Sequence, residues 1–198
     1  MGVELEIKFQ ATPAQQLALR AAYPGDEETI AMETTYYDTA NGALSDRHYT
    51  LRRRTENQRS VCTLKTPVSG FGRGEFDLCR DSIEAALPEL CKLSGVDDLL
   101  ELTGGGVIPV CGAKFTRIAK TLVLPEATVE LALDTGILSG GGKEIPLCEI
   151  EVELKEGSWD AAIAFARDIA STYRLTPEKA SKFRRALALA KGESYGTA

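Results

Sequence analysis

VELEIKF, at residues 3–9, alternates charged and apolar side chains with a period of two. Successive side chains of a β-strand point to opposite faces, so this stretch predicts a strand with Glu4, Glu6 and Lys8 on one face. The other face is entirely apolar. If the charged face meets solvent, the strand is an ordinary amphipathic one; if that face points into an enclosed space, ions line the space. The rest of the sequence has to decide between these two arrangements.

Length and composition limit the class of protein. The 198 residues suit one domain over residues 1–198, with the helical part at 158–191 included. The net charge of −6 disfavours duplex nucleic acid as a partner. No apolar run approaches the roughly 20 residues that a membrane-spanning helix needs, and the acidic N-terminus is unlike a secretory signal. We therefore expect a cytoplasmic protein that contacts neither a membrane nor duplex nucleic acid.

The cysteine and histidine content excludes several kinds of site. The five cysteines are widely spaced and form no CxxC pair, which disfavours a disulfide framework and a zinc knuckle. His48 is the one histidine in the sequence, so a metal centre built from several histidines is excluded.

Strand-like segments dominate the first four fifths of the sequence. Runs rich in Thr, Tyr, Val and Phe, separated by turn signals, predict strands at 3–9, 29–39, 49–55, 59–68, 72–80, 111–124, 127–140 and 143–157. Helices are predicted at 13–23, about 81–93, 158–173 and 176–192, the last with Thr176 as N-cap, Pro177 at its first position and Gly192 as its stop. Helices and strands do not alternate regularly, and short gaps favour antiparallel pairing. We predict an α+β fold in which eight antiparallel strands form a barrel.

Charge recurs on one face of nearly every predicted strand. CEIEVELK, at 148–155, repeats the alternation of the N-terminal stretch, with Glu149, Glu151 and Glu153 on one face. For any single strand, a solvated face is the simpler explanation. The predicted helices, however, carry apolar faces of their own and need an apolar surface to cover. We therefore expect helices packed outside the barrel and a tunnel with a polar lumen inside.

A polar lumen requires its charges to be paired or to bind ligands, because an isolated buried ion is very costly. The inward bases predicted by strand parity are Lys8, Arg52, Arg54, Lys65, Arg73 and Arg117. The inward acids are Glu4, Glu6, Glu75, Glu130, Glu149, Glu151 and Glu153. Clustered carboxylates suit a hard divalent cation such as Mg²⁺ or Mn²⁺, and clustered Arg and Lys suit a polyanion. Both clusters in one cavity suit a metal-complexed polyphosphate.

An ordered set of motifs runs along the chain. ExExK lies at 4–8, YYDT at 36–39, LRRR at 51–54, TLK at 63–65, RGE at 73–75, VELALDTG at 129–136, EIEVELK at 149–155 and SKFRRAL at 181–187. ExExK alone is weak, because amphipathic strands produce it by chance. The ordered set, which covers residues 3 to about 190, resembles the CYTH family of triphosphate tunnel metalloenzymes. The contexts YYDTANGAL and LRRR are most similar to the bacterial inorganic triphosphatase branch.

This resemblance implies an eight-stranded antiparallel tunnel that hydrolyses inorganic triphosphate with Mg²⁺ or Mn²⁺. It implies substrate binding by Arg52, Arg54, Lys65, Arg73, Arg117, Lys182 and Arg185. It implies metal binding by Glu4, Glu6, Glu130, Glu149, Glu151 and Glu153. Lys8 and Glu6 are the candidate catalytic residues, and Lys8 either orients the attacking water or binds an end phosphate. Arg73 alternatively forms an ion pair with Glu75 in the tunnel wall.

Other activities and assemblies stay open at this point. Three alternatives share much of the pattern: an adenylate cyclase, a thiamine triphosphatase, and a non-catalytic polyphosphate- or nucleotide-binding module. The sequence also leaves open whether the chain forms a homodimer. The sequence also departs from the family at Phe115, where a second basic residue is common. Either that substrate contact is missing or a bulge turns Lys114 inward. We expect no helical CHAD module after this domain.

Overall fold

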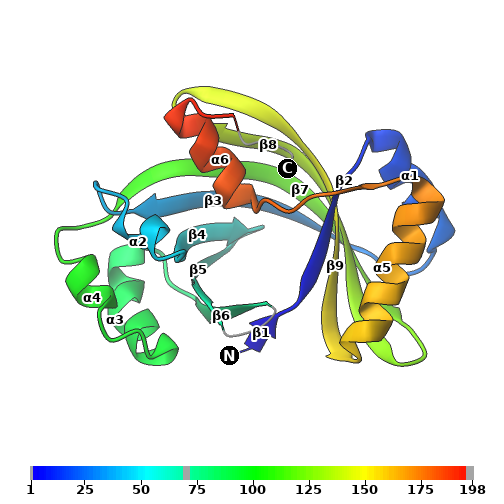
Figure 1. The fold of residues 1–198 in the computed structure, drawn as a ribbon, viewed down its shortest axis with the longest axis horizontal. Coiled ribbons are helices and arrows are strands. Elements are labelled where there is room, and N and C mark those ends of the chain that lie inside the picture. Colours follow the sequence, from blue (N-terminus) through cyan, green and yellow to red (C-terminus); the bar gives the residue numbers. More distant parts are fainter. Residues whose placement is uncertain (1, 69–71, 195–198) are drawn as a thin grey trace.

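The computed structural model describes residues 2–68 and 72–194, so the predicted domain over residues 1–198 extends beyond the described residues. One sheet of ten strands runs through this part of the chain, and every neighbouring pair is antiparallel (Figure 1). The strands are β1 (Gly2–Glu4), β2 (Glu6–Gln10), β3 (Glu28–Asp38), β4 (Thr50–Glu56), β5 (Arg59–Pro67), β6 (Arg73–Leu78), β7 (Ile108–Val123), β8 (Ala127–Gly140), β9 (Lys143–Gly157) and β10 (Thr176–Pro177). The helices are α1 (Pro13–Ala22), α2 (Ala43–Asp46), α3 (Ile83–Ser94), α4 (Leu99–Leu102), α5 (Trp159–Tyr173) and α6 (Lys182–Lys191).

The N-terminal segment connects the two ends of the sheet. The strand order is β1-β6-β5-β4-β3-β7-β8-β9-β2-β10. β1 pairs with β6 and β2 pairs with β9, with Leu5 between them. The ladder is therefore interrupted at Leu5, yet the same short segment runs along both β6 and β9, as Figure 1 shows. The predicted eight antiparallel strands are confirmed, with the first split into β1 and β2 and a two-residue β10 added.

Two apolar cores lie on the outer side of the sheet. α1 and α5 cover one core, in which Leu19 and Ile169 meet Val129, Ile150 and other strand residues. The helices α3 and α4 cover the second core over β4, β5 and β6 (Figure 1). The apolar strand faces thus point outward under these helices, as the sequence predicts.

Helix α6 packs on the opposite, inward face. Phe183 joins a third core with Phe115 of β7 and Leu138 of β8. Phe115 shares a strand face with Arg117, and Leu138 shares one with Asp134, so this core lies on the face that carries the charges. The expectation that helices pack outside therefore does not extend to α6. At this end of the tunnel the inward faces become apolar, which gives α6 a surface to cover.

The predicted start of the last helix at Thr176 is wrong. Thr176 and Pro177 instead form β10 against β2, and the Glu178 N–H donates to the Lys8 carbonyl at 2.8 Å. Ser181 is the N-cap, and its hydroxyl accepts from the Arg184 N–H at 3.1 Å. Both positions carry capping signals, and pairing with β2 decides between them. The predicted stop at Gly192 is confirmed by its left-handed φ of +71°.

Lys114 and Phe115 resolve the departure from the family pattern. Lys114 points outward, with 71% of its side chain exposed and its Nζ 3.8 Å from a Glu33 carboxylate oxygen. The bulge between β3 and β7 lies at Tyr36/Tyr37 and does not turn Lys114 inward. Phe115 takes the inward position, so an aromatic ring stands where a basic side chain is common.

Within residues 2–68 and 72–194, no helix combines the length and the apolar character that crossing a membrane requires.

Candidate active site

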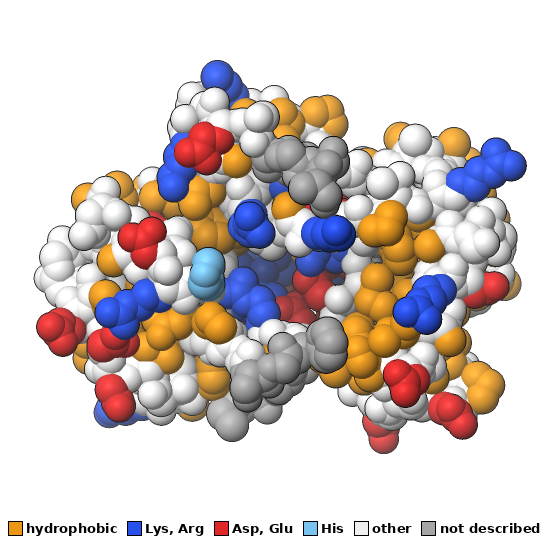
Figure 2. Space-filling model, viewed as in Figure 1, with side chains coloured by type: hydrophobic (Ala, Val, Ile, Leu, Met, Phe, Trp, Pro, Cys, Tyr) orange, Lys and Arg blue, Asp and Glu red, His pale blue; other side chains and the backbone are white. Residues whose placement is uncertain are grey.

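A cavity of about 250 Å³ lies inside the curved sheet. Figure 2 shows it as a hollow near the centre of the view, with basic and acidic side chains in its floor. Its basic lining is Lys8, Arg52, Arg54, Lys65, Arg73, Arg117, Lys179, Lys182 and Arg184. Its acidic lining is Glu4, Glu6, Glu151 and Glu153. The charged face of the N-terminal stretch therefore points into this cavity.

Strand register explains why acids gather on one side. Neighbouring strands place Glu149 of β9 opposite Asp134 of β8, and Glu151 of β9 opposite Lys8 of β2. Two residues further along β9, Glu153 lies opposite Glu6 of β2 and Glu130 of β8. Residues opposite each other in a ladder point to the same face, so the acidic rows of three adjacent strands become one surface. Four of the nine basic lining residues come from β4, β5 and β6, and we call these four the basic wall: Arg52, Arg54, Lys65 and Arg73.

Lys65 and Arg52 are tied to acids of the cavity wall. Lys65 forms ion pairs with Glu4 and with Glu75, the second at 3.2 Å, and the Arg52 guanidinium lies 3.2 Å from Glu75. Arg52 Nε is buried and makes no hydrogen bond. A donor without a partner therefore remains in the basic wall.

Arg73 does not form the alternative ion pair with Glu75. Its guanidinium donates to the Thr50 hydroxyl at 3.2 Å and to the carbonyls of His48 and Lys65. Glu75 instead pairs with Arg52 and Lys65, because the β5–β6 register places it opposite Lys65. Arg73 thereby holds the backbone beside the cavity while also lining it.

Arg54 is a buried cation of the basic wall with one distant carboxylate partner. Its side chain is 9% exposed, donates to the Thr34 hydroxyl at 3.0 Å, and lies 4.0 Å from Glu56. Its guanidinium carbon lies 5.7 Å from the centre of the Phe115 ring. Burial, together with the positive charge of Arg52, lowers the pKa of Arg54 to about 10. A buried guanidinium in this setting favours an anionic ligand.

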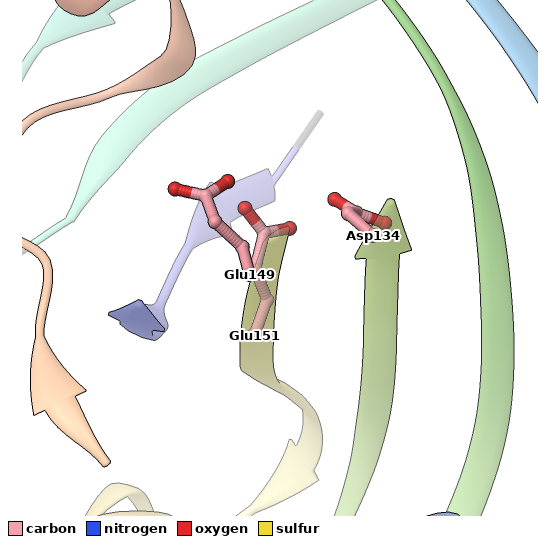
Figure 3. Close-up of side chains that lie close together, drawn as sticks. All are labelled: Asp134, Glu149 and Glu151. Atoms are coloured by element: carbon pink, nitrogen blue, oxygen red, sulfur yellow. The ribbon is translucent and has the colours of Figure 1, made fainter. Parts of the chain in front are cut away.

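Three carboxylates converge at the acidic wall. One oxygen from each of Asp134, Glu149 and Glu151 lies within 4.8 Å of the others. Figure 3 shows the three side chains pointing toward one another from β8 and β9. Asp134 and Glu149 are fully buried, and Glu151 is 7% exposed. We call these three residues the acidic triad.

Cations of the chain surround the acidic triad. The Lys182 ammonium lies 2.8 Å from Asp134, 2.6 Å from Glu149 and 2.6 Å from Glu151. Arg117 binds Asp134 through two hydrogen bonds, at 2.8 and 2.7 Å, and also contacts Glu151. Arg117 is also 3.6 Å from Glu130. Paired in this way, buried carboxylates can remain ionised.

The two glutamates of the triad have opposite pKa shifts. Burial, which outweighs the attraction of Lys182, raises the pKa of Glu149. Burial alone would also raise the pKa of Glu151, but Lys182, Arg117 and Lys8 together hold it well below its usual value. The Glu151 carboxylate is thus the more firmly ionised of the two.

Three predicted site residues lie outside the cavity lining. Arg185 contacts Glu149 and lies 3.8 Å from Glu178, so it sits behind the triad. Glu149 is buried in the triad itself, and Glu130 pairs with Arg117 and, at 3.5 Å, with Lys155. Strand parity predicts the inward direction of Glu130 and Glu149 but not their depth, whereas the role of Arg185, on α6, was implied by the family resemblance.

Gln16 is a site residue that the sequence does not reveal. Its side-chain amide reaches from α1 and donates to the carbonyls of Asp134, at 3.0 Å, and Glu149, at 2.8 Å. The Thr135 hydroxyl donates to its amide oxygen at 2.7 Å. Gln16 therefore fixes the backbone of two triad residues from the outer side of the sheet. Asp134 is likewise not singled out by the sequence, although it shares a strand face with Glu130.

The triad fits a divalent cation by its chemistry. It offers oxygen donors, which hard cations such as Mg²⁺ and Mn²⁺ prefer. Glu149 Oε2 is buried and makes no well-oriented hydrogen bond, although the Lys182 ammonium lies 2.6 Å away. The oxygen spacing of the triad, within 4.8 Å, leaves room for one central cation.

This chain is similar to a curated protein of known activity. An inorganic triphosphatase from Haemophilus influenzae is 29% identical over 190 residues, which cover 92% of this chain and 53% of that protein. The chain thus spans about half the length of this relative.

Solved structures share the fold at lower identity. A proposed adenylyl cyclase from Hippeastrum, with a dominant triphosphatase activity, matches with a TM-score of 0.67 and 19% identity, covering 98% of each chain. A protein from Pyrococcus horikoshii matches with a TM-score of 0.59 and 20% identity, covering 95% of this chain and 99% of that one.

The family model of the CYTH domain matches residues 2–187, which include every strand, both walls of the cavity and the first half of α6. With its antiparallel tunnel, its basic and acidic walls and this match over nearly its whole length, the chain belongs to the CYTH domain family.

Proposed function

We propose that this chain hydrolyses inorganic triphosphate to pyrophosphate and phosphate with the help of Mg²⁺ or Mn²⁺. One observation supports the proposal above all: a single cavity has a basic wall and is also lined by Glu151, one member of the buried acidic triad, whose other two members lie behind it. The basic wall suits the substrate and the acidic wall suits its cation. The activity of the Haemophilus relative supports the same reaction.

The basic wall would grip the phosphates. Arg52 and Arg54 have donors or charge that the chain itself does not fully satisfy, and Lys65 stands next to them. Arg73 belongs to the same wall, and Arg117, which pairs with the acidic triad, also lines the cavity. Arginine binds phosphate oxygens through paired N–H donors, so this wall would position the transferring phosphoryl group and offset its charge.

The acidic triad would hold the metal ion. When bound there, a divalent cation neutralises phosphoryl charge and lowers the pKa of a bound water. Glu4, Glu6 and Glu153 line the same cavity as Glu151 and are the candidates for a second cation. Glu130 and Arg185 then serve to hold Arg117 and Glu149, respectively.

Lys8 would act as a charged donor. Burial alone would lower the pKa of Lys8, but Glu6 and Glu151 raise it above its ordinary value. Its ammonium donates to a Glu6 oxygen at 2.8 Å. A permanently charged Lys8 cannot take a proton from water, so it would bind an end phosphate or orient water by donation. Glu6, beside it, is the acceptor that would position the attacking water.

The cavity supports an inorganic substrate over a nucleotide or a thiamine ester. Among its described lining residues the aromatic side chains are Tyr36 and Phe183. These are 3% and 6% exposed and pack on each other, with ring centroids 5.1 Å apart. Neither ring offers a free face on which an organic base could stack.

Phosphate release from triphosphate, measured with Mg²⁺ and with a chelator, tests the proposal. We expect release with Mg²⁺ or Mn²⁺ and little release with chelator. Equal rates under both conditions would rule out the metal-dependent mechanism.

Two assays separate the alternatives. A binding module would show tight polyphosphate binding by calorimetry without turnover. A cyclase would convert ATP to cyclic AMP, which chromatography distinguishes from hydrolysis products. Thiamine triphosphate belongs in the same substrate panel.

The proposed setting is the cytoplasm, where triphosphate compounds and Mg²⁺ coexist, and the proposed partner is the small-molecule substrate. The acidic net charge of −6 supports the exclusion of duplex nucleic acid. A homodimer would be detected by light scattering and would not alter the site, because one chain supplies both walls.

A further inference from the structure

Lys182 occupies an unusual position in the acidic triad. It is the first residue of α6, and its single ammonium nitrogen lies within 2.8 Å of an oxygen of each triad residue. Its side chain is only 7% exposed. An ordinary ion pair has one partner, whereas here one nitrogen is placed where three carboxylates converge.

The position of this ammonium coincides with the place that a divalent cation needs. The triad oxygens lie within 4.8 Å of one another, and Mg²⁺ binds oxygen at roughly 2.0–2.1 Å. Such a cation at the centre would stand almost where the Lys182 nitrogen now lies. Two cations cannot share that point, because their repulsion at low dielectric would be very large.

We infer that Lys182 is an internal counterion that keeps the acidic triad assembled without metal and is displaced by the metal when it binds. This inference rests on the proposed function in one respect, since it takes the triad as the metal site. It assigns Lys182 a role other than the direct substrate contact that the family pattern implies.

The cavity beside the triad offers space into which the Lys182 ammonium can move. Its side chain also lines the cavity, and its nitrogen lies 5.3 Å from the centre of the Phe115 ring. The flexible four-carbon stem can turn the ammonium from the triad toward the basic wall without moving α6. Arg185, by contrast, is held between Glu149 and Glu178 outside the cavity lining and has no comparable route.

Displacement would couple the metal to the substrate. When the ammonium leaves the triad, it adds positive charge to the cavity, where the triphosphate would lie. Metal binding would then strengthen triphosphate binding, and by reciprocity triphosphate would strengthen metal binding.

Titration of Mn²⁺ alone into Lys182→Met, followed by calorimetry at pH 8, tests this inference. Removing the competing ammonium should tighten Mn²⁺ binding at least tenfold relative to the unchanged protein. Lys191→Met is the matched control, because Lys191 is an exposed lysine on the same helix and lies outside the cavity lining. It removes the same charge and should change Mn²⁺ affinity less than twofold.

Thermal unfolding covers the case in which Lys182→Met folds poorly. Without Lys182 the triad carries uncompensated charge, so the variant should unfold earlier in chelator and gain more in Tm from Mn²⁺ than the unchanged protein does. Equal or weaker Mn²⁺ affinity in a folded Lys182→Met, or no binding in either protein, would overturn the inference. Neither measurement contains triphosphate. A negative hydrolysis assay would therefore contradict the proposed function without bearing on the inference about Lys182.

Discussion

At the residue scale, the alternation of side chains along the strands predicts most of the residues that line the cavity. Glu4, Glu6 and Lys8 point into the cavity because their strand period is two, and the same parity places Arg52 and Arg54 correctly. Parity could not show that Glu149 is buried behind the cavity, since depth depends on which strands are neighbours. Asp134 was predictable from its shared face with Glu130, whereas Gln16, in an ordinary amphipathic helix, gives no signal.

Arg54→Ala tests the basic wall. We expect kcat/KM for triphosphate to fall roughly 10- to 100-fold, because a charge-assisted contact contributes about 1.5–3 kcal/mol. Arg53→Ala is the control: Arg53 points to the other face of β4, and its guanidinium donates to the Asp81 carbonyl at 2.8 Å. Steady-state kinetics measure both variants. Equal losses of kcat/KM in Arg54→Ala and Arg53→Ala would contradict a role of Arg54 in binding triphosphate.

Gln16→Leu tests the backbone support of the triad. The change leaves two buried carbonyls without the amide donor, which should lower the free energy of unfolding by about 1–3 kcal/mol. It should also weaken Mn²⁺ binding, since Asp134 and Glu149 lose their fixed backbone. Urea unfolding and calorimetry measure the two effects. Leu17→Ala, at a side chain 68% exposed, should change neither.

At the element scale, the sequence predicts the strands well and the last helix poorly. Long alternating segments such as β8 and β9 have the predicted bounds, because period and turn signals agree. For α6, two capping signals compete, and a tertiary contact of Glu178 with the β2 backbone decides between them. The sequence also does not show that α6 packs inward, because its apolar face is like that of the outer helices.

Gly140→Ala tests the close packing of α6 on β8. A Cβ at Gly140 would lie 2.4 Å from the Ala186 carbonyl oxygen, so α6 would have to shift away. We expect a loss of about 1–3 kcal/mol in the free energy of unfolding and weaker triphosphate binding, because α6 carries Lys182. Gly105→Ala, where an added Cβ meets nothing within 4 Å, is the control. Unchanged urea midpoints for Gly140→Ala would contradict this packing.

At the scale of the whole molecule, one short N-terminal segment decides the architecture. Its alternation predicts an inward charged face, but not that its two halves pair with different strands, β6 and β9. That pairing depends on strands more than 60 residues away in the sequence, such as β6 at Arg73–Leu78. It brings basic and acidic walls together in a chain whose net charge is −6.

A ligand that touches both walls should stabilise the whole fold. Triphosphate with Mn²⁺ at about 100 times its dissociation constant should add about 2.7 kcal/mol to the free energy of unfolding, which corresponds to roughly 5–10 °C in Tm. Differential scanning calorimetry measures the shift. The Arg54→Ala variant should show a smaller shift at the same concentrations, and an identical shift would place the ligand elsewhere.

A crystal structure with Mn²⁺ and a non-hydrolysable triphosphate analogue, with anomalous data at the manganese edge, tests the central claim most directly. The structure predicts an anomalous peak among Asp134, Glu149 and Glu151, with the analogue against Arg52 and Arg54 in the same cavity. An analogue bound outside the sheet, or manganese bound away from these carboxylates, would contradict it.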